Sequence, residues 1–234
     1  MGQRSMADII TQLKESVAEK ARAVGRMPEE VKIVLVSKTV EPERMLQAFE
    51  AGMRDFGESR VQEFLRKRKF FPPEIRWHMI GHLQTNKVKQ VVGNVVLIHS
   101  LDRRELYEEL DRQGRQKNVK EIDCLIQVNS SGEGTKSGFA PEEVSAFISE
   151  LRKDSPVKIR GLMTIGAFSE DEKTVRDCFR KVKNLRDELV RNFPDHDWGI
   201  LSMGMSSDYL LAIEEGANML RIGSAVFGAR QNPA

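Results

Sequence analysis

The chain has 234 residues, of which 37 are lysine or arginine and 35 are aspartate or glutamate, for a formal net charge of +2. This near-neutral balance favours neither nucleic acid nor an acidic substrate as the dominant partner, and 40% hydrophobic residues are enough to build a sizeable core. No apolar run approaches the roughly 18 residues that span a membrane, and the N-terminus lacks the apolar core and cleavage site of a signal peptide. The sequence therefore predicts a globular cytoplasmic protein with no membrane and no nucleic-acid partner.

Strand-like and helix-like segments alternate along the chain. Apolar residues at helical spacing predict an opening helix that ends near Gly25. After it, short apolar runs rich in β-branched residues are each followed by a polar or glycine-containing corner and then by a helical stretch. The runs predict eight strands, over 32–38, 54–59, 76–82, 95–100, 124–129, 159–165, 198–203 and 218–224. The helical stretches between them cover 42–51, 59–70, 84–92, 102–117, 141–153, 171–192 and 206–215.

This alternation favours one fold. Continuous apolar runs indicate strands buried on both faces, and helices between the strands imply parallel crossovers. Segments 48–57 and 212–223 both contain a helix end, a glycine C-cap, a short strand and a closing glycine, as repeated units would. We expect a single (β/α)8 barrel over residues 1–234 with an extra N-terminal helix. An open doubly wound sheet is the alternative, weakened because no G-x-G-x-x-G follows the first strand.

Two groups of residues indicate structure more than chemistry. The basic run "RKRK" at 66–69 lies on an amphipathic helix, which favours a solvated face over a weak anion-binding patch. Cys124 and Cys178 lie in a predicted strand and helix, so buried free thiols are expected. No cluster of carboxylates and histidines has the spacing of metal ligands, and no metal is predicted.

Lys38 ends the first strand-like run, at the carboxyl end of the barrel strands where active sites of this fold lie. In one interpretation it is a rim lysine whose stem packs while its ammonium reaches solvent or Glu58. In the other it is a desolvated lysine whose lowered pKa makes it a nucleophile toward a carbonyl. Strand position alone favours the first interpretation. Lys136, in a loop at 132–138 that is expected to close over the barrel mouth, is the second candidate for a reactive lysine.

The corners after the last two strands indicate an anion site. Ser206 and Ser207 are N-cap candidates for one helix, and Gly223 and Ser224 begin a short last helix. Backbone N–H groups at helix starts bind anions, and phosphate sites of this fold recur in these two loops. Plain capping would explain each loop alone, but the two together favour a phosphate. With Lys38 they predict a ligand carrying an aldehyde and a phosphate, which fits pyridoxal 5′-phosphate (PLP) and also a sugar phosphate.

Arg221 ends the last strand beside this predicted site. It could face a heterocycle nitrogen, and because arginine only donates hydrogen bonds it would keep a pyridine nitrogen unprotonated. A salt-bridged arginine at the rim is the alternative. His82 is expected to bond a neighbouring loop, and His78 and His99 are expected to be structural.

Eight motifs carry a family resemblance: "LVSKT", "AGMRDFGESRVQE", "WHMIGHLQTNK", "IHSLDR", "GTKSG", "GLMTI", "LSMGMSSD" and "LRIGSAVFGAR". In this order, from about residue 31 to 230, they resemble the pyridoxal phosphate homeostasis protein family. The resemblance implies a barrel like the N-terminal domain of bacterial alanine racemase, with PLP as a Schiff base on Lys38. It further implies phosphate contacts at Ser206, Ser207, Gly223 and Ser224, and Arg221 near the pyridine nitrogen. Ser59 stands where the family usually has asparagine, so it remains a cofactor-contact candidate whose shorter side chain lacks the amide.

Cofactor binding without turnover is the favoured function. Alanine racemases resemble this barrel but add a second domain, whose tyrosine is the base on the opposite face of the cofactor. Here the chain ends after the last helix, and its only tyrosines, Tyr107 and Tyr209, lie on predicted helices. Two-base racemisation needs a proton acceptor on each face. We therefore expect a protein that binds PLP reversibly and supplies it to apo-enzymes, with a minimal PLP-dependent amino-acid racemase or a Schiff-base aldolase as alternatives. With no second domain and no obvious apolar face left over, a monomer is expected.

Overall fold

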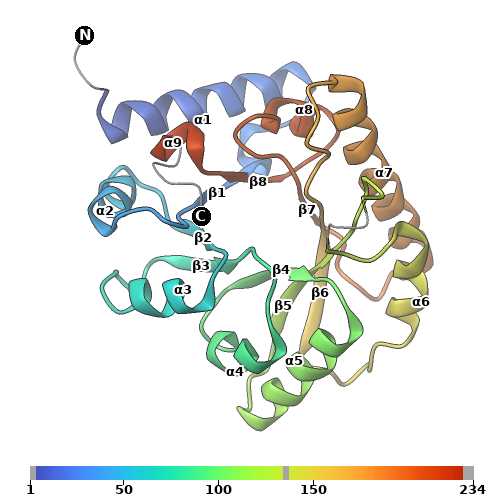
Figure 1. Ribbon diagram of the computed structural model, residues 1–234. Helices are drawn as coiled ribbons and strands as arrows, with labels where there is room; N and C mark the ends of the chain where they lie inside the picture. Colours follow the sequence, from blue (N-terminus) through green and yellow to red (C-terminus); the bar gives the residue numbers. More distant parts are fainter. Residues whose placement is uncertain (1–3, 134–136, 229–234) are drawn as a thin grey trace.

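The computed structural model describes residues 4–133 and 137–228, so Lys136 lies outside the described residues. A closed barrel of parallel strands forms the centre, viewed along its axis in Figure 1. The strands follow chain order around the ring, and β8 closes it by pairing with β1, from Lys32 against Met219 to Leu35 against Ile222. The predicted barrel is confirmed, and the open-sheet alternative is wrong. The strands are β1 (Lys32–Val36), β2 (Asp55–Glu58), β3 (Arg76–Met79), β4 (Leu97–Leu101), β5 (Ile122–Gln127), β6 (Val157–Met163), β7 (Ile200–Ser202) and β8 (Met219–Ile222).

Helices surround the barrel on the outside (Figure 1). The α-helices are α1 (Met6–Ala23), α2 (Pro42–Glu50), α3 (Val61–Arg68), α4 (Val88–Val91), α5 (Arg104–Gln116), α6 (Val144–Ser149), α7 (Glu172–Asn192), α8 (Tyr209–Glu214) and α9 (Ser224–Phe227). Three short 3-10 turns are η1 (Pro28–Glu30), η2 (Thr85–Lys87) and η3 (Pro141–Glu143). None of the helices in the described part of the chain is both long and apolar enough to cross a membrane.

The N-terminal helix is the extra element that the sequence predicts. Ser5 caps α1 through a reciprocal pair of bonds with Asp8, and the helix ends at Ala23, just before Gly25, whose φ of 74° no longer fits a helix. Its apolar face packs against α2, α8 and α9, so it covers the seam between β8 and β1 (Figure 1). Lys20 pairs with Glu214 on α8 at 2.5 Å. The buried residues of the helix are Met6, Ile10, Leu13, Val17 and Ala21.

The repeated units have the same backbone geometry. Gly52 ends α2 with φ of 90°, and Gly216 ends α8 with φ of 97°. The next residue donates its N–H back into each helix, Met53 to Ala48 at 3.1 Å and Ala217 to Ala212 at 2.8 Å. A left-handed glycine with this bond is a standard way to end a helix. Each turn delivers the chain into a strand, β2 and β8, that lies next to β1.

The structure shortens several predicted strands at their carboxyl ends. The prediction for β1 ran to residue 38 and that for β3 to 82, whereas the strands end at Val36 and Met79. The residues beyond are the polar corners, which leave the strand pairing and turn at the mouth. At their amino ends β5 and β6 begin two residues before the predicted 124 and 159. Asp123, one of the residues added to β5, forms an ion pair with Arg160 on β6 at 2.7 Å.

The core has two parts. The larger part lies between the barrel and the helices and contains Cys124. Cys124 and Cys178 are both free thiols and both buried, as predicted. The smaller part fills the barrel itself. Its members come from five different strands: Val34, Leu97, Leu125, Met163 and Met219. Because side chains alternate between the faces of a strand, residues two positions after these also point into the barrel.

Candidate functional site

The predicted site residues come together at one part of the barrel mouth. Lys38 follows β1, Ser59 follows β2, and the remaining residues lie on β8 or in the loops after β7 and β8. Because β7, β8, β1 and β2 are consecutive around the ring, the carboxyl ends of these strands are neighbours. Which of the residues bind a ligand remains a prediction.

Lys38 lies in a tight turn directly after β1. Val40 donates its N–H to the carbonyl of Ser37 at 3.0 Å, and Thr39 between them has a left-handed φ of 61°. That conformation is unfavourable for a β-branched residue and persists only where neighbouring groups support it. The support comes from Glu63 on α3, whose carboxylate accepts the Thr39 N–H at 2.7 Å. The backbone that carries the half-buried Lys38 is therefore held in one geometry.

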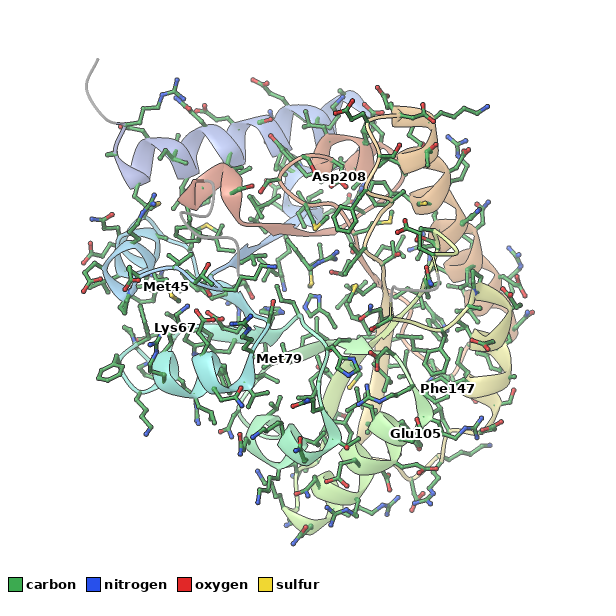
Figure 2. The ribbon with its side chains drawn as sticks, in the orientation of Figure 1. Met45, Lys67, Met79, Glu105, Phe147 and Asp208 are labelled. Carbon is green, nitrogen blue, oxygen red and sulfur yellow. The ribbon has the colours of Figure 1, made fainter. Side chains whose placement is uncertain are left out.

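A buried lysine supports this turn from behind. Lys67 on α3 is 1% exposed, and its ammonium donates to the Ser37 carbonyl at 2.6 Å, to Glu58 at 2.8 Å and to Glu63 at 2.6 Å. Figure 2 labels its side chain on α3. The solvated face predicted for "RKRK" is wrong at this residue, although Arg66, Arg68 and Lys69 are exposed. The spacing Val61, Phe64, Lys67 on the buried face of the helix is the signal that could have identified it.

Glu58 completes the cluster behind Lys38. It is fully buried and accepts a bond from the Ser37 hydroxyl at 2.7 Å in addition to the Lys67 ammonium. Burial raises the pKa of Glu58, and the nearby Lys67 charge opposes that rise. Its second carboxylate oxygen has no hydrogen-bond partner among the described residues. Ser37 and Thr39, on either side of Lys38, are thus both tied to one buried ion-pair cluster.

The loop after β7 differs from its prediction. Helix α8 begins at Tyr209, so Ser206 and Ser207 do not cap it. Asp208, labelled in Figure 2, closes the turn by accepting the Met205 N–H at 2.5 Å. Ser206 is used elsewhere, because its hydroxyl accepts the N–H groups of Gly223 and Ala225 at 3.1 Å each.

The short last helix is present as predicted. Gly223 is the N-cap residue and α9 begins at Ser224. The N–H groups of Gly223 and Ala225 converge on one oxygen, that of Ser206, which shows that two backbone donors at this helix start can share one acceptor. Ser207 and Ser224 are exposed beside this point. A phosphate oxygen is the kind of acceptor that such donors bind.

Arg221 is a buried cation beside this helix start. It is 4% exposed and donates to the Ser202 hydroxyl at 2.7 Å and to the Thr164 carbonyl at 2.8 Å. It has no carboxylate within 4.0 Å among the described residues, so the salt-bridged rim arginine considered above is wrong. Burial lowers its pKa to about 10, and the more distant charge of Asp208 opposes this. A buried cation without a direct counter-charge is costly and fits an anionic or electron-rich ligand.

Ser59 and His82 lie at the next two corners. The Ser59 hydroxyl has no hydrogen-bond partner in the described part of the chain, and a Cβ added to Gly81 would meet the Ser59 carbonyl oxygen at 2.5 Å. Ser59 is therefore packed against the corner after β3. His82 bonds Asp102 at 2.7 Å, in agreement with the predicted contact to a neighbouring loop.

The comparisons with known proteins agree with this architecture. The family described as "Alanine racemase, N-terminal domain" matches residues 14–231. The chain is 42% identical, over 95% of its length and 97% of the relative, to the pyridoxal phosphate homeostasis protein of Aquifex aeolicus. It is 38% identical, over 97% of its length and 98% of the relative, to the protein of the same name from Vibrio alginolyticus.

Solved structures show the same likeness. A protein from Bifidobacterium adolescentis superposes with a TM-score of 0.87 at 30% identity, over 95% of this chain and 94% of that one. PipY of Synechococcus elongatus, solved with PLP bound, superposes with a TM-score of 0.80 at 33% identity, over 91% of this chain and all 100% of that one. Sequence identity and fold thus agree over nearly the whole length of the chain. The chain belongs to the pyridoxal phosphate homeostasis protein family, built on the alanine racemase N-terminal domain.

Proposed function

We propose that this protein binds PLP reversibly, as a Schiff base on Lys38, and serves PLP homeostasis without turnover of its own. One observation carries the proposal. The converging N–H groups of Gly223 and Ala225 and the buried, uncompensated Arg221 lie on strands and loops next to the turn that carries Lys38. Phosphate, ring nitrogen and aldehyde of PLP have matching partners there. The names of the relatives and the PLP-bound PipY structure support the same ligand.

The phosphate would be held by the loops after β7 and β8. At the start of α9 the phosphate would take over the Gly223 N–H that now donates to the Ser206 hydroxyl, and Ser206, Ser207 and Ser224 supply hydroxyls around it. Helix-start N–H groups and hydroxyls fit the acceptor oxygens of a phosphate. Ser59 at the β2 corner stays a candidate contact because its hydroxyl has no partner among the described residues.

Arg221 and Lys38 would hold the ring and the aldehyde. When bound, PLP supplies an aldehyde that condenses reversibly with a primary amine, releasing one water. Lys38 supplies that amine, and the cluster of Lys67, Glu58 and Glu63 keeps its turn in place. Arg221 offers only donors, so it can bond a ring nitrogen but cannot protonate it. The cofactor ring would then be a poor electron sink, which suits holding over catalysis.

The tyrosines support a role without turnover. The phenol oxygen of Tyr107 accepts the N–H of Arg152 at 2.9 Å, and that of Tyr209 bonds Ser16 on α1 at 3.0 Å. Both phenols therefore have partners in the outer layer of helices. Neither is placed as the second base that a two-base racemisation needs.

Borohydride reduction tests the ligand and the lysine together. PLP added to the wild type should give a visible absorption band, and reduction should fix one adduct on Lys38, located by peptide mass spectrometry. Lys38→Ala should lose the band and the adduct, whereas Lys69→Ala, at an exposed position just after α3, should keep both. An adduct that persists in Lys38→Ala would show that the lysine assignment is wrong. Steady amino-acid racemisation by the wild type, lost in Lys38→Ala, would show an enzyme instead.

We further propose that residues 1–234 form one domain that acts as a cytoplasmic monomer and passes PLP to apo-enzymes. The packing of α1 against α2, α8 and α9 around a single closed barrel supports one domain. Light scattering should give the mass of one chain. An apo-enzyme mixed with the loaded protein should recover activity faster than the spontaneous release of PLP permits if delivery is direct.

A further inference from the structure

A continuous line of hydrogen-bonded side chains crosses the inside of the barrel. From Arg221, Nη1 donates to the Ser202 hydroxyl at 2.7 Å, and that oxygen lies 3.0 Å from Nδ1 of His99. Nε2 of His99 lies 3.0 Å from Nδ1 of His78, and Nε2 of His78 lies 2.9 Å from Oδ1 of Asp55. All five residues are buried, with at most 5% of the residue surface exposed.

The line passes through the centre of the barrel and not along its wall. Ser202 is on β7 and His99 on β4, and these strands are not neighbours in the ring. Ser202 and His99 each follow by two positions a residue of the barrel interior or one packed against it, Ile200 and Leu97. The bond between them therefore spans the interior. The whole line joins Asp55, the first residue of β2, to Arg221 near the barrel mouth.

The chemistry of the ends gives every bond in the line one direction. Arginine has no acceptor, so Ser202 accepts from Arg221, and the hydroxyl proton of Ser202 is available to Nδ1 of His99. His99 then carries its proton on Nε2 and donates to Nδ1 of His78. His78 carries its proton on Nε2 and donates to the Asp55 carboxylate. The reverse order would place a bare ring nitrogen against a carboxylate, with no proton to form that bond.

The charges around the line agree with this direction. Burial lowers the pKa of both His78 and His99, so both rings are neutral near pH 7. Burial alone would raise the pKa of Asp55, but hydrogen bonds from Arg76 and His78 hold it below its ordinary value. The line thus connects a buried guanidinium to a buried carboxylate through neutral groups. Because each donor in such a series strengthens the next bond, Ser202 becomes a better acceptor for Arg221.

We propose that His78 and His99 are positioning residues for Arg221. The inference rests on the proposed function, in which Arg221 faces the ring nitrogen of PLP. One side of the guanidinium is held by the line through Ser202 and the other by the Thr164 carbonyl. Its remaining N–H groups have no hydrogen-bond partner among the described residues, so they are the ones from which a ligand can accept. The two histidines therefore act on the cofactor ring without touching it.

Interrupting the line should change the bound cofactor but not its attachment. His99→Leu removes both ring nitrogens, and His99→Gln keeps one acceptor and one donor. We expect His99→Leu to shift the visible circular dichroism of bound PLP and to raise its dissociation constant about tenfold. Borohydride should still fix one adduct on Lys38. His99→Gln should recover much of the wild-type spectrum, which a merely space-filling role would not predict.

Asp111→Asn is the matched control. Asp111 is as buried as these residues, at 2% exposed, but it bonds Arg115 and Arg152 in the outer layer of helices. This variant should leave the spectrum unchanged. If His99→Leu does not fold, Ser202→Ala gives the second measurement, because it breaks the same line by removing one hydroxyl and should shift the spectrum in the same direction.

The outcomes separate this inference from the proposed function. A wild type that forms no adduct on Lys38 overturns both. A wild type that forms it, with folded His99→Leu or Ser202→Ala variants whose spectrum and affinity match those of Asp111→Asn, overturns the positioning role alone.

Discussion

Lys67 places a buried positive charge directly behind the turn that carries Lys38. Lys67→Met would keep the length of the side chain but leave Glu58 and Glu63 without their cation. Breaking a buried ion pair in this way costs about 3–5 kcal/mol of unfolding free energy. We expect a loss of that size in denaturant unfolding, together with slower formation of the PLP adduct, because the Ser37 carbonyl loses its donor and Glu63, which holds the Thr39 N–H, loses its cation. The exposed neighbour variant Lys69→Met should change the unfolding free energy by less than about 0.5 kcal/mol.

Asp55 links stability to acid pH. Its pKa in the folded state is held below the ordinary 3.8 by Arg76 and His78, against the effect of burial. The folded state therefore binds this proton less readily than the unfolded state does. The resulting stability is present above about pH 4 and is lost as the pH falls further. Asp55→Asn should be less stable than the wild type at pH 7 and should lose less stability between pH 5 and pH 3, as measured by urea unfolding. An unchanged acid dependence in this variant would contradict the assignment.

Single residues show where sequence reasoning stops. Lys38 and Arg221 could be selected because the sequence places each near the carboxyl end of a strand. The structure places Lys38 just after β1 and Arg221 near the end of β8, as expected. The sequence could not show that Lys67 is buried, because a basic run on a helix is usually solvated and only the spacing from Phe64 indicated otherwise. It also could not show that Arg221 bonds Ser202 and Thr164, since three strands must be brought together before those contacts exist.

At the scale of elements, the loop after β7 depends on one glycine. Gly204 has φ of 92°, and a Cβ added there would lie 2.6 Å from the Cβ of Ala212 on α8. Gly204→Ala should therefore lose about 2 kcal/mol or more of unfolding free energy from backbone strain and the clash together. It should also weaken PLP binding, because the loop positions Ser206 against Gly223 and Ala225.

Gly25→Ala separates the two effects of the Gly204 substitution. Gly25 has a similar φ of 74°, but an added Cβ would meet nothing within 4 Å. It should show the strain alone, about 1 kcal/mol, with PLP affinity unchanged. Equal losses in both variants would mean that close packing against α8 is unimportant.

The sequence predicted which helices and strands exist better than it predicted the residues at which they begin and end. The alternation of apolar runs and helical stretches was enough to place every strand of the barrel. The start of α8 was not, because Ser206 looks like an N-cap in the sequence but bonds the start of a different helix 17 residues later. Local patterns indicate that a hydroxyl will find a partner, and only the closed ring decides which one.

At the scale of the molecule, ring closure determines what the site can do. The pairing of β8 with β1 brings the first strand, with Lys38, next to the last, with Arg221 and the start of α9. The barrel could be predicted because its period is visible in the sequence. The polar line through its interior could not, because a strand's sequence does not reveal which strand faces it across the barrel. His78 and His99 were expected to be structural, and their bonds to Asp55 and Ser202 show what that structure connects.

A ligand bound on both sides of the pairing between β8 and β1 should stabilise the whole fold. PLP would join β1 through Lys38 to the loops after β7 and β8, and binding to the folded state alone adds about 2.7 kcal/mol at one hundred times the dissociation constant. Pyridoxal lacks the phosphate and pyridoxine phosphate lacks the aldehyde, so each should raise the thermal midpoint less than PLP at equal concentration. In Lys38→Ala, PLP should stabilise no more than pyridoxine phosphate does, because only the phosphate loops remain. Pyridoxal that stabilises the wild type as strongly as PLP would show that the loops after β7 and β8 do not hold the phosphate.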